Sequence, residues 1–331
     1  MSTTAVKAPG TKVAASISWF VARRLLATML LLVVLSFLIF SLLYLAPGDI
    51  AKNLLGTKTV TPEALAAVRE QYHLDDPFLV QYWRWLSGVI GGDWGTSIRS
   101  GLPVADEIAS RAGLTVRLIV LGFLIAAVVS IPAGVWAARR RGTWVDRTLV
   151  SGAVVGVSAP GFAVGLLLLF VFAVTLRWFP VYGTGEGFWG QLWHLTLPAI
   201  ALAVGLGALV VQLTRAAVVR ELEQDYVTFQ RSRGLSEARV MGTVLRNAAI
   251  PIVTSLGLMV TYLVGGTILV EVVFGLPGLG TQLQQAVLFK DVPVVQALTL
   301  IVGLVVCLIS LAVDLIYLVI DPRILRKAVA K

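Results

Sequence analysis

The chain has 331 residues, of which 57% are hydrophobic and 14% are charged, and its net charge is +9. The charged share lies well below the ~25% of soluble domains, so the composition excludes an ordinary soluble globular protein. The basic residues form short clusters between long uncharged runs and no basic domain, which excludes a nucleic-acid-binding function.

Residues 1–24 are predicted to form a cytoplasmic N-terminal segment, and the first apolar run follows from Leu25 to Ala46. This run is longer than the ~7 to 15 residues of a signal-peptide core, and no small-residue cleavage site follows it. We therefore expect a retained first transmembrane helix at residues 25–46.

Five more apolar runs are long enough to cross a bilayer, which takes roughly 20 residues per helix because every backbone polar group must be satisfied within the segment. None of the six runs contains Asp, Glu, Lys, Arg or His. The sequence therefore predicts an all-α integral membrane protein with six transmembrane helices. The five later runs are Leu118–Ala138, Leu149–Leu176, Leu195–Leu213, Ala248–Val270 and Val292–Val313.

Orientation follows from the basic residues, because short loops rich in Lys and Arg stay on the cytoplasmic side. With the N-terminus inside, 18 of the 27 Lys and Arg residues lie in cytoplasmic segments, whereas the short outer loops hold only Arg177 and Lys290. We expect a multi-pass protein of the bacterial inner membrane with both termini cytoplasmic, the C-terminal one being the tail 321–331.

Residues 47–117 between the first two runs are polar enough to form a small helical extracytoplasmic insertion. Thr61 is placed to cap a helix that begins at Pro62 and carries Leu65, Val68 and Tyr72 on one face. Trp83, Trp85 and Trp94 follow, and tryptophan prefers the headgroup zone. The segment could anchor on the membrane as an amphipathic collar or receive a soluble partner.

The third run is interrupted by Ser158, Ala159, Pro160 and Gly161, which should weaken the helix near the middle of the membrane. Either a bent helix faces a cavity, or neighbouring helices absorb the kink by packing.

The cytoplasmic loop 220–247 between the fourth and fifth runs has an internal pattern of its own. Residues 225–233 are compatible with a short helix, and Gly234 follows where a left-handed residue would end it. Ser236 is then placed to cap a second amphipathic helix that carries Val240 and Val244 into the fifth run. The loop therefore predicts a short helix held between two breaks.

Tyr226, Phe229, Gln230 and Arg233 lie at spacings of three, four and seven on this short helix and should form one face. Aromatic residues and arginine are common anchors of protein interfaces, so the face could bind the groove of a partner. An interfacial helix with its rings among lipid headgroups is the alternative. The residue pattern alone leaves both open.

Motifs along most of the chain after about Phe20 resemble one family, the dipeptide, oligopeptide and nickel branch of the ABC importer permeases. In the loop the similar residues are Asp225, Tyr226, Arg231, Ser232, Arg233, Gly234, Leu235, Ser236, Arg246, Asn247, Ile250 and Pro251. Before the loop they are Leu45, Ala46, Pro47, Gly48, Asp49, Gln81, Tyr82, Arg84, Trp85, Leu86, Gly92, Asp93, Gly95 and Ser97. After the loop they are Glu271, Phe274, Pro277, Gly278, Leu279, Gly280, Asp291, Pro293, Val294, Val295, Gln296, Asp314, Asp321, Pro322 and Arg323.

One part of the loop departs from the general importer pattern, which begins with Glu-Ala-Ala and places a proline about a dozen residues after the glycine. This chain has Thr228, Phe229 and Gln230 instead, and Pro251 lies 17 residues after Gly234. The departure leaves the family assignment intact, and the contact of each loop residue has to be measured.

The resemblance implies the type I ABC importer permease fold, with residues 118–320 as the permease core and 220–247 as its coupling loop. It implies these partners: a second, related permease subunit, two ATP-binding cassette subunits, an extracytoplasmic substrate-binding protein and the lipid bilayer. No Walker A motif occurs, so this chain is expected to be no enzyme and to hold no cofactor, with ATP bound by the partner subunits. The expected ATPase-coupling residues are Asp225, Tyr226, Phe229, Gln230, Arg231, Arg233, Gly234, Leu235 and Ser236.

The substrate is expected to be a dipeptide, an oligopeptide or a similar solute. Six polar residues could line the pathway, or could equally form hydrogen bonds within and between the helices. They are Ser158, Gln212, Thr214, Ser255, Thr261 and Tyr262.

Two other functions have less support in the sequence. An ion-coupled secondary transporter usually has ionisable residues near the middle of the membrane, and the six runs contain none. A membrane enzyme needs a catalytic constellation, but Asp49, Glu271 and Asp314 lie near different span ends with no visible pairing. His73 and His194 are the only histidines and Cys307 the only cysteine, none at metal-ligand spacing, so no metal site is expected and nickel gains no support.

Overall fold

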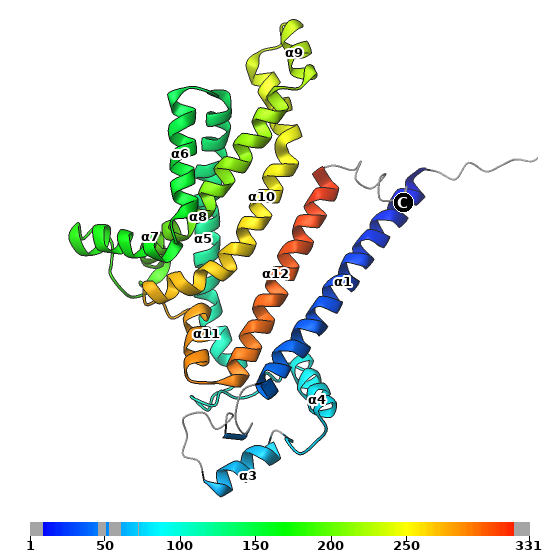
Figure 1. Ribbon diagram of the computed structural model, residues 1–331, viewed down its shortest axis with the longest axis vertical. Helices are drawn as coiled ribbons and strands as arrows, with labels where there is room; N and C mark the ends of the chain where they lie inside the picture. The colour runs from blue at the N-terminus through cyan, green and yellow to red at the C-terminus, as the bar shows by residue number, and fades with distance from the viewer. Residues whose placement is uncertain (1–8, 46–50, 53–60, 72, 321–331) are drawn as a thin grey trace, which may run out of the picture.

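The structure is a computed structural model that describes residues 9–45, 51–52, 61–71 and 73–320. Helices make up most of this part of the chain (Figure 1), and no β-strand occurs in it. The helices are α1 Pro9–Leu45, α3 Pro62–Gln71, α4 Phe78–Ile90, α5 Val104–Arg139, α6 Trp144–Ser158, α7 Gly161–Leu168, the π-helix η1 Leu169–Thr175, α8 Gly187–Leu222, α9 Asp225–Ser232, α10 Glu237–Val273, α11 Leu279–Leu288 and α12 Val292–Ile320.

Five helices of the described part are long and apolar enough to cross a membrane, and they belong to α1, α5, α8, α10 and α12. The sixth predicted span corresponds to a bent pair, α6 followed by α7 and η1. The predicted count of six therefore holds if the bent pair is one span. Figure 1 shows α9 at one end of the long axis and α3 and α4 at the other, and we call these the α9 end and the α4 end.

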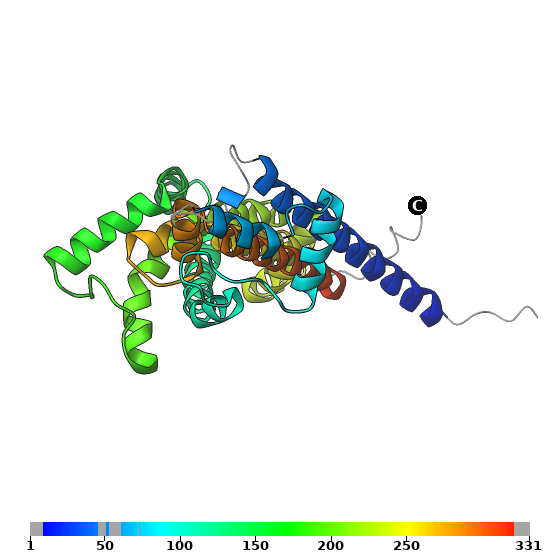
Figure 2. The ribbon, with the colours of Figure 1, turned by 90° about the horizontal axis from the view of Figure 1, so that it is seen from below.

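The break in the third predicted run is larger than an ordinary kink, because the two halves meet at 102°. Ala159 has extended backbone angles, as expected before a proline, and Pro160 lacks the N–H that would continue the helix. As a result α7 projects from one side of the bundle, opposite α1 (Figure 1 and Figure 2). The sequence prediction of a weak point here is confirmed.

The central helix α8 packs against α5 and α10 in the main hydrophobic core. Small residues bring α5 and α8 together, as is usual for membrane helices. At Gly134 an added Cβ would lie only 2.8 Å from the carbonyl oxygen of Val211 and 2.7 Å from the Cβ of Thr214. The backbones of α5 and α8 are therefore in close contact, and these helices form one packed unit.

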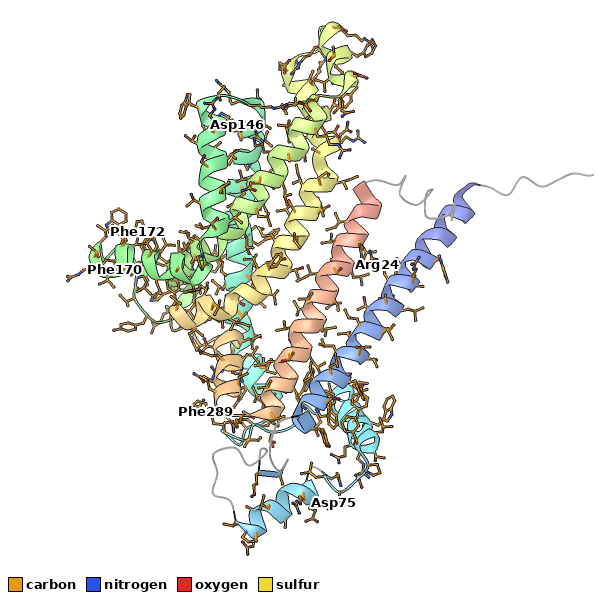
Figure 3. All side chains as sticks on the ribbon, viewed as in Figure 1. Arg24, Asp75, Asp146, Phe170, Phe172 and Phe289 are labelled. Atoms are coloured by element: carbon orange, nitrogen blue, oxygen red, sulfur yellow. The ribbon has the colours of Figure 1, made fainter. Side chains whose placement is uncertain are left out.

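The helices α1 and α12 form a second pair, which an ion pair joins near the middle of Figure 3. The guanidinium of Arg24 donates to the carboxylate of Asp314, with both nitrogen–oxygen distances at 2.9 Å. The sequence shows no pairing among the carboxylates near the span ends, and the partner of Asp314 is a cation that lies 290 residues away. Asp49 lies outside the described residues.

The predicted start of the helix in segment 47–117 is confirmed: α3 begins at Pro62, and the hydroxyl of Thr61 accepts a hydrogen bond from the N–H of Ala64 at 3.1 Å. Leu65 is half-buried, whereas the side chain of Val68 and all of Tyr72 lie outside what the structure describes. The predicted boundary at residues 117 and 118 falls inside α5, so the segment runs into the second span without a helix break.

The three tryptophans of this segment differ in exposure. Trp83 is 63% exposed, but Trp85 and Trp94 are half-buried. The ring of Trp85 lies 5.4 Å from that of Phe40 on α1 and 6.3 Å from that of Tyr82, measured between centroids. Trp85 therefore joins α4 to α1 through aromatic packing.

A buried carboxylate joins three helices at the α4 end. Glu271, at the end of α10, is fully buried and accepts hydrogen bonds from the hydroxyl of Thr115 on α5 at 2.6 Å and from the N–H groups of Gly280 and Thr281 at 2.7 and 3.1 Å. The Thr115 hydroxyl also accepts the N–H of Leu279 at 2.9 Å. The start of α11 is thus tied to both spans through partners of Glu271 that the sequence does not reveal.

A second buried carboxylate, Asp291, holds the segment before α5 against the corner between α11 and α12. It accepts hydrogen bonds from the Ser97 hydroxyl at 2.5 Å and from the N–H groups of Ile98 and Arg99 at 3.1 and 3.2 Å. Carboxylates bound by several N–H and O–H donors make strong hydrogen bonds. The segment 97–99 is therefore fixed to the bundle.

Candidate functional site

The α9 end carries the short helix that the loop pattern predicts (Figure 1). Helix α9 spans Asp225–Ser232, one residue shorter than the prediction. Gly234 follows with φ of +74°, the left-handed conformation, and Leu235 then donates its N–H to the carbonyl of Gln230 at 3.2 Å. The prediction of a helix ended by a left-handed glycine is confirmed, because glycine reaches this conformation without a steric cost.

The turn before α10 is stabilised by other contacts than the sequence predicts. Ser236 precedes α10 with extended backbone angles, as an N-cap residue should, but its side chain makes no capping hydrogen bond to the described helix. Glu237 instead turns back to Arg231, with Nε to Oε1 at 2.8 Å and Nη2 to Oε2 at 3.2 Å. This ion pair raises the pKa of Arg231, because its hydrogen bond to Glu237 favours the charged form. The ion pair thus links α9 to the start of α10 across the turn between them.

One residue, Val227, anchors α9 to the rest of the protein. Its side chain is fully buried and packs in a cluster with Val218 of α8 and with Val240 and Val244 of α10. Ala138 at the end of α5 belongs to the same cluster. Helix α9 therefore shares one hydrophobic cluster with residues of three long helices.

The four residues predicted to share one face of α9 divide into two pairs. Tyr226 is half-buried and donates its hydroxyl to Glu221 on α8 at 2.9 Å, and burial raises the pKa of this phenol. Gln230 is half-buried and donates to the hydroxyl of Thr243 on α10 at 3.3 Å. The spacing predicts a shared face but not its exposure, because it fixes the direction of a side chain around the helix axis and not which side neighbouring helices cover.

The other pair faces outwards. Phe229 is 61% exposed, and the guanidinium carbon of Arg233 lies 5.6 Å from the centroid of its ring, within the range of a cation–π contact. We call the exposed residues of this helix and its end the α9 surface, which consists of Asp225, Thr228, Phe229, Arg231, Ser232 and Arg233. An exposed aromatic ring beside arginines, on a helix packed rigidly by Val227, is suited to binding a protein groove.

The six residues predicted to line a pathway differ in their surroundings. Thr214 and Ser255 are buried inside the chain, whereas Tyr262 is 57% exposed and Gln212 is half-buried. The hydroxyls of Ser158, Ser255 and Thr261 donate to carbonyls of their own helices, three or four residues earlier. These contacts favour the structural alternative for the hydroxyls, and a pathway role stays a prediction.

The two histidines have separate surroundings. The Nδ1 atom of His194 lies 2.8 Å from the carbonyl oxygen of Gly190, and His73 is exposed in a turn with φ of +49°. Cys307 is buried in α12.

Sequence reasoning missed an ion pair near the α9 end, between Asp146 at the start of α6 and Arg215 on α8. One signal could have revealed it. Asp146 is the only acid among Arg139, Arg140, Arg141 and Arg147, immediately before a predicted span.

Comparisons with known proteins agree with one another. The family described as the binding-protein-dependent transport system inner membrane component matches residues 130–326, and the N-terminal domain of such membrane components matches residues 17–118. The glutathione transport system permease protein GsiC of Escherichia coli K12 is 40% identical over 309 residues, which cover 93% of this chain and 99% of that protein. A probable peptide ABC transporter permease protein, y4tP of Sinorhizobium fredii, is 36% identical over 309 residues, covering 92% and 98%.

Proposed function

Because the chain belongs to the family of binding-protein-dependent transport system inner membrane components and is an ABC importer permease subunit, we propose that its α9 surface is where an ATP-binding cassette subunit docks. The observation that carries this proposal is the arrangement of α9, with Val227 buried against α8 and α10 and Phe229 exposed opposite. Such a helix can receive force from outside and pass it to two spans.

The lipid alternative for α9 is less suited to this geometry. Trp144, which is 74% exposed, lies at the connection between α5 and α6, beside arginines that suit the headgroup level of the inner leaflet. Figure 1 shows α9 farther along the long axis than this connection. We infer that α9 extends beyond the headgroups into the cytoplasm, with both termini on the same side.

The proposed assembly follows from the family and from the sequence. This chain would pair with a second, related permease subunit, with two ATPase subunits at the α9 end and an extracytoplasmic binding protein at the α4 end of a bacterial inner membrane. ATP would be bound and hydrolysed only by the partners, since the sequence has no Walker A motif. Closure of the ATPases on α9 would rotate the spans α8 and α10 and alternate the access of the pathway.

The proposed cargo is a short peptide or a peptide-like solute such as glutathione, which is what the names of the relatives say of those proteins. The test is uptake into proteoliposomes that contain the complete complex and its binding protein, with radiolabelled glutathione and a labelled tripeptide as probes. Uptake of at least one probe should require ATP on the side of the membrane on which α9 lies. Uptake that runs without ATP and stops with a proton ionophore would instead establish an ion-coupled transporter.

Replacement of Phe229 by alanine is expected to weaken docking without weakening the fold. A buried aromatic anchor contributes about 2 kcal/mol to an interface, which is roughly thirtyfold in Kd. Titration of the purified ATPase subunit onto the permease pair in nanodiscs measures this change.

The matched control is Phe188→Ala, since Phe188 is 72% exposed at the opposite end of α8. Its Kd should equal that of the unchanged protein. Equal Kd values for the two variants would refute the role of the α9 surface.

A further inference from the structure

The ion pair between Asp146 and Arg215 joins α6 to α8 near the α9 end; Asp146 is labelled in Figure 3. Arg215 donates from Nε to Oδ1 of Asp146 at 2.5 Å and from Nη2 to Oδ2 at 2.8 Å. Asp146 is only 4% exposed. Two parallel hydrogen bonds fix the orientation of both side chains as well as their distance, and burial keeps water from replacing either bond.

The same carboxylate also holds the connection that leads into α6. Oδ2 of Asp146 accepts the N–H of Gly142 at 2.9 Å, and Gly142 has the left-handed φ of +79°. Asp146 lies in the first turn of α6, where a carboxylate also stabilises the helix N-terminus. One side chain therefore positions the connection after α5, the start of α6 and the side of α8.

Helix α6 lies outside the hydrophobic packing around α9. The cluster that holds Val227 draws residues from α5, α8, α9 and α10, and none of its described members comes from α6. Farther along, α6 touches α8 through Gly156, where an added Cβ would lie 2.9 Å from the Cβ of Ala208. Ala153 of α6 is buried in a cluster with Ala208 and Val211 of α8. The ion pair adds a directional contact at the end of α6 that lies nearest α9, where this apolar packing does not fix the orientation of the helix.

We propose that Asp146 and Arg215 are positioning residues of the transport cycle, which make α6 and the broken span beyond it follow α8 when α9 is displaced. The inference rests on the proposed function, because the displacement is attributed to an ATPase at α9. The bend of 102° after Ser158 gives this coupling a consequence. A rotation of α6 would swing the projecting α7, so an α6 locked to α8 moves α7 in step with the ATPase.

The test is a pair of distance measurements by double electron–electron resonance in the complete complex, reconstituted in nanodiscs with Cys307→Ala as background. Spin labels at Arg147→Cys and Ala216→Cys report α6 against α8, and labels at Ala216→Cys and Leu315→Cys report α8 against α12. These positions are exposed or lie on helix surfaces away from the α9 surface. Each pair is measured without nucleotide and after trapping with ATP and vanadate.

In the unchanged protein the α6–α8 distance should be narrow and the same in both states, while the α8–α12 distance changes on trapping. With Asp146→Asn, which keeps the shape of the side chain but removes its charge, the α6–α8 distance should broaden and shift on trapping. The number of ATP molecules hydrolysed for each conformational change, as reported by the α8–α12 distance, should rise on the order of fivefold. Arg215→Gln should broaden and shift the α6–α8 distance in the same way as Asp146→Asn. The variant with both substitutions should show no larger change than either one alone.

The matched control is Arg141→Gln, which removes a surface ion pair between the connection that leads into α6 and Glu223, the residue after α8; both of these side chains are more than half exposed. It should leave the α6–α8 distance unchanged. An Asp146→Asn protein whose α6–α8 distance stays narrow and unchanged would overturn the inference while the proposed function stands. An α8–α12 distance that does not respond to trapping in the unchanged protein would overturn the proposed function and, with it, this inference.

Discussion

Replacement of Gly234 by valine is expected to separate ATP hydrolysis from uptake. Gly234 has φ of +74°, and a β-branched residue in this conformation carries about 1–3 kcal/mol of strain. An added Cβ meets no atom within 4 Å, so the effect comes from the backbone and not from a clash. The chain can relieve the strain by rotating the turn between α9 and α10, which moves the α9 surface relative to α10.

The expected result is that uptake falls at least about tenfold while hydrolysis by the assembled complex stays within about twofold, because coupling energies of 1–3 kcal/mol correspond to such factors. Both rates are measured on the same proteoliposomes, with probe accumulation and phosphate release followed in parallel. Loss of both rates together, with intact subunits in the complex, would show that α9 is needed for hydrolysis itself.

The control at the same position is Gly234→Asn, because asparagine adopts the left-handed conformation far more readily than valine. It should keep uptake near that of the unchanged protein although it is larger than glycine. If asparagine and valine impair uptake equally, the size of the side chain and not its backbone angle is what matters. The comparison therefore tests the physical reason and not only the position.

Replacement of Glu271 by alanine is expected to cause the largest loss of stability among the changes considered. It would remove the acceptor of the Thr115 hydroxyl and of the Gly280 and Thr281 N–H groups, at a site where Glu271 is fully buried. Each unsatisfied buried donor costs about 1–3 kcal/mol, so the sum is about 3 kcal/mol or more even if water reaches one of them. The unfolding midpoint of the purified chain in detergent measures the loss.

Two controls isolate the cause. Glu271→Gln keeps an acceptor oxygen in place and should lose less than half as much stability as alanine. Asp75→Ala removes an exposed carboxylate at the same end of the molecule, and the unfolding free energy should stay within about 0.5 kcal/mol. An alanine variant at 271 as stable as the Asp75→Ala protein would show that the hydrogen bonds to Glu271 contribute little.

The short helix and its turn show how far local pattern reaches. The predicted limits of α9 differ from the observed ones by one residue, and the left-handed conformation of Gly234 is confirmed. Both depend on interactions within a few residues, which sequence reasoning can evaluate. The exposure of the face does not follow from the local pattern, since Tyr226 and Gln230 bind α8 and α10 while Phe229 stays exposed.

The sequence by itself determined that this protein resides in a lipid bilayer. It also determined the long apolar helices, the break at Pro160 and the family. These follow from composition, from runs of about 20 apolar residues and from motifs, all of which are readable along the chain. Only the tertiary structure decided the pairing of Arg24 with Asp314, of Thr115 with Glu271 and of Asp146 with Arg215. Each pair joins different helices, so it depends on which helix faces pack together, and helical periodicity contains no information about the partner across that contact.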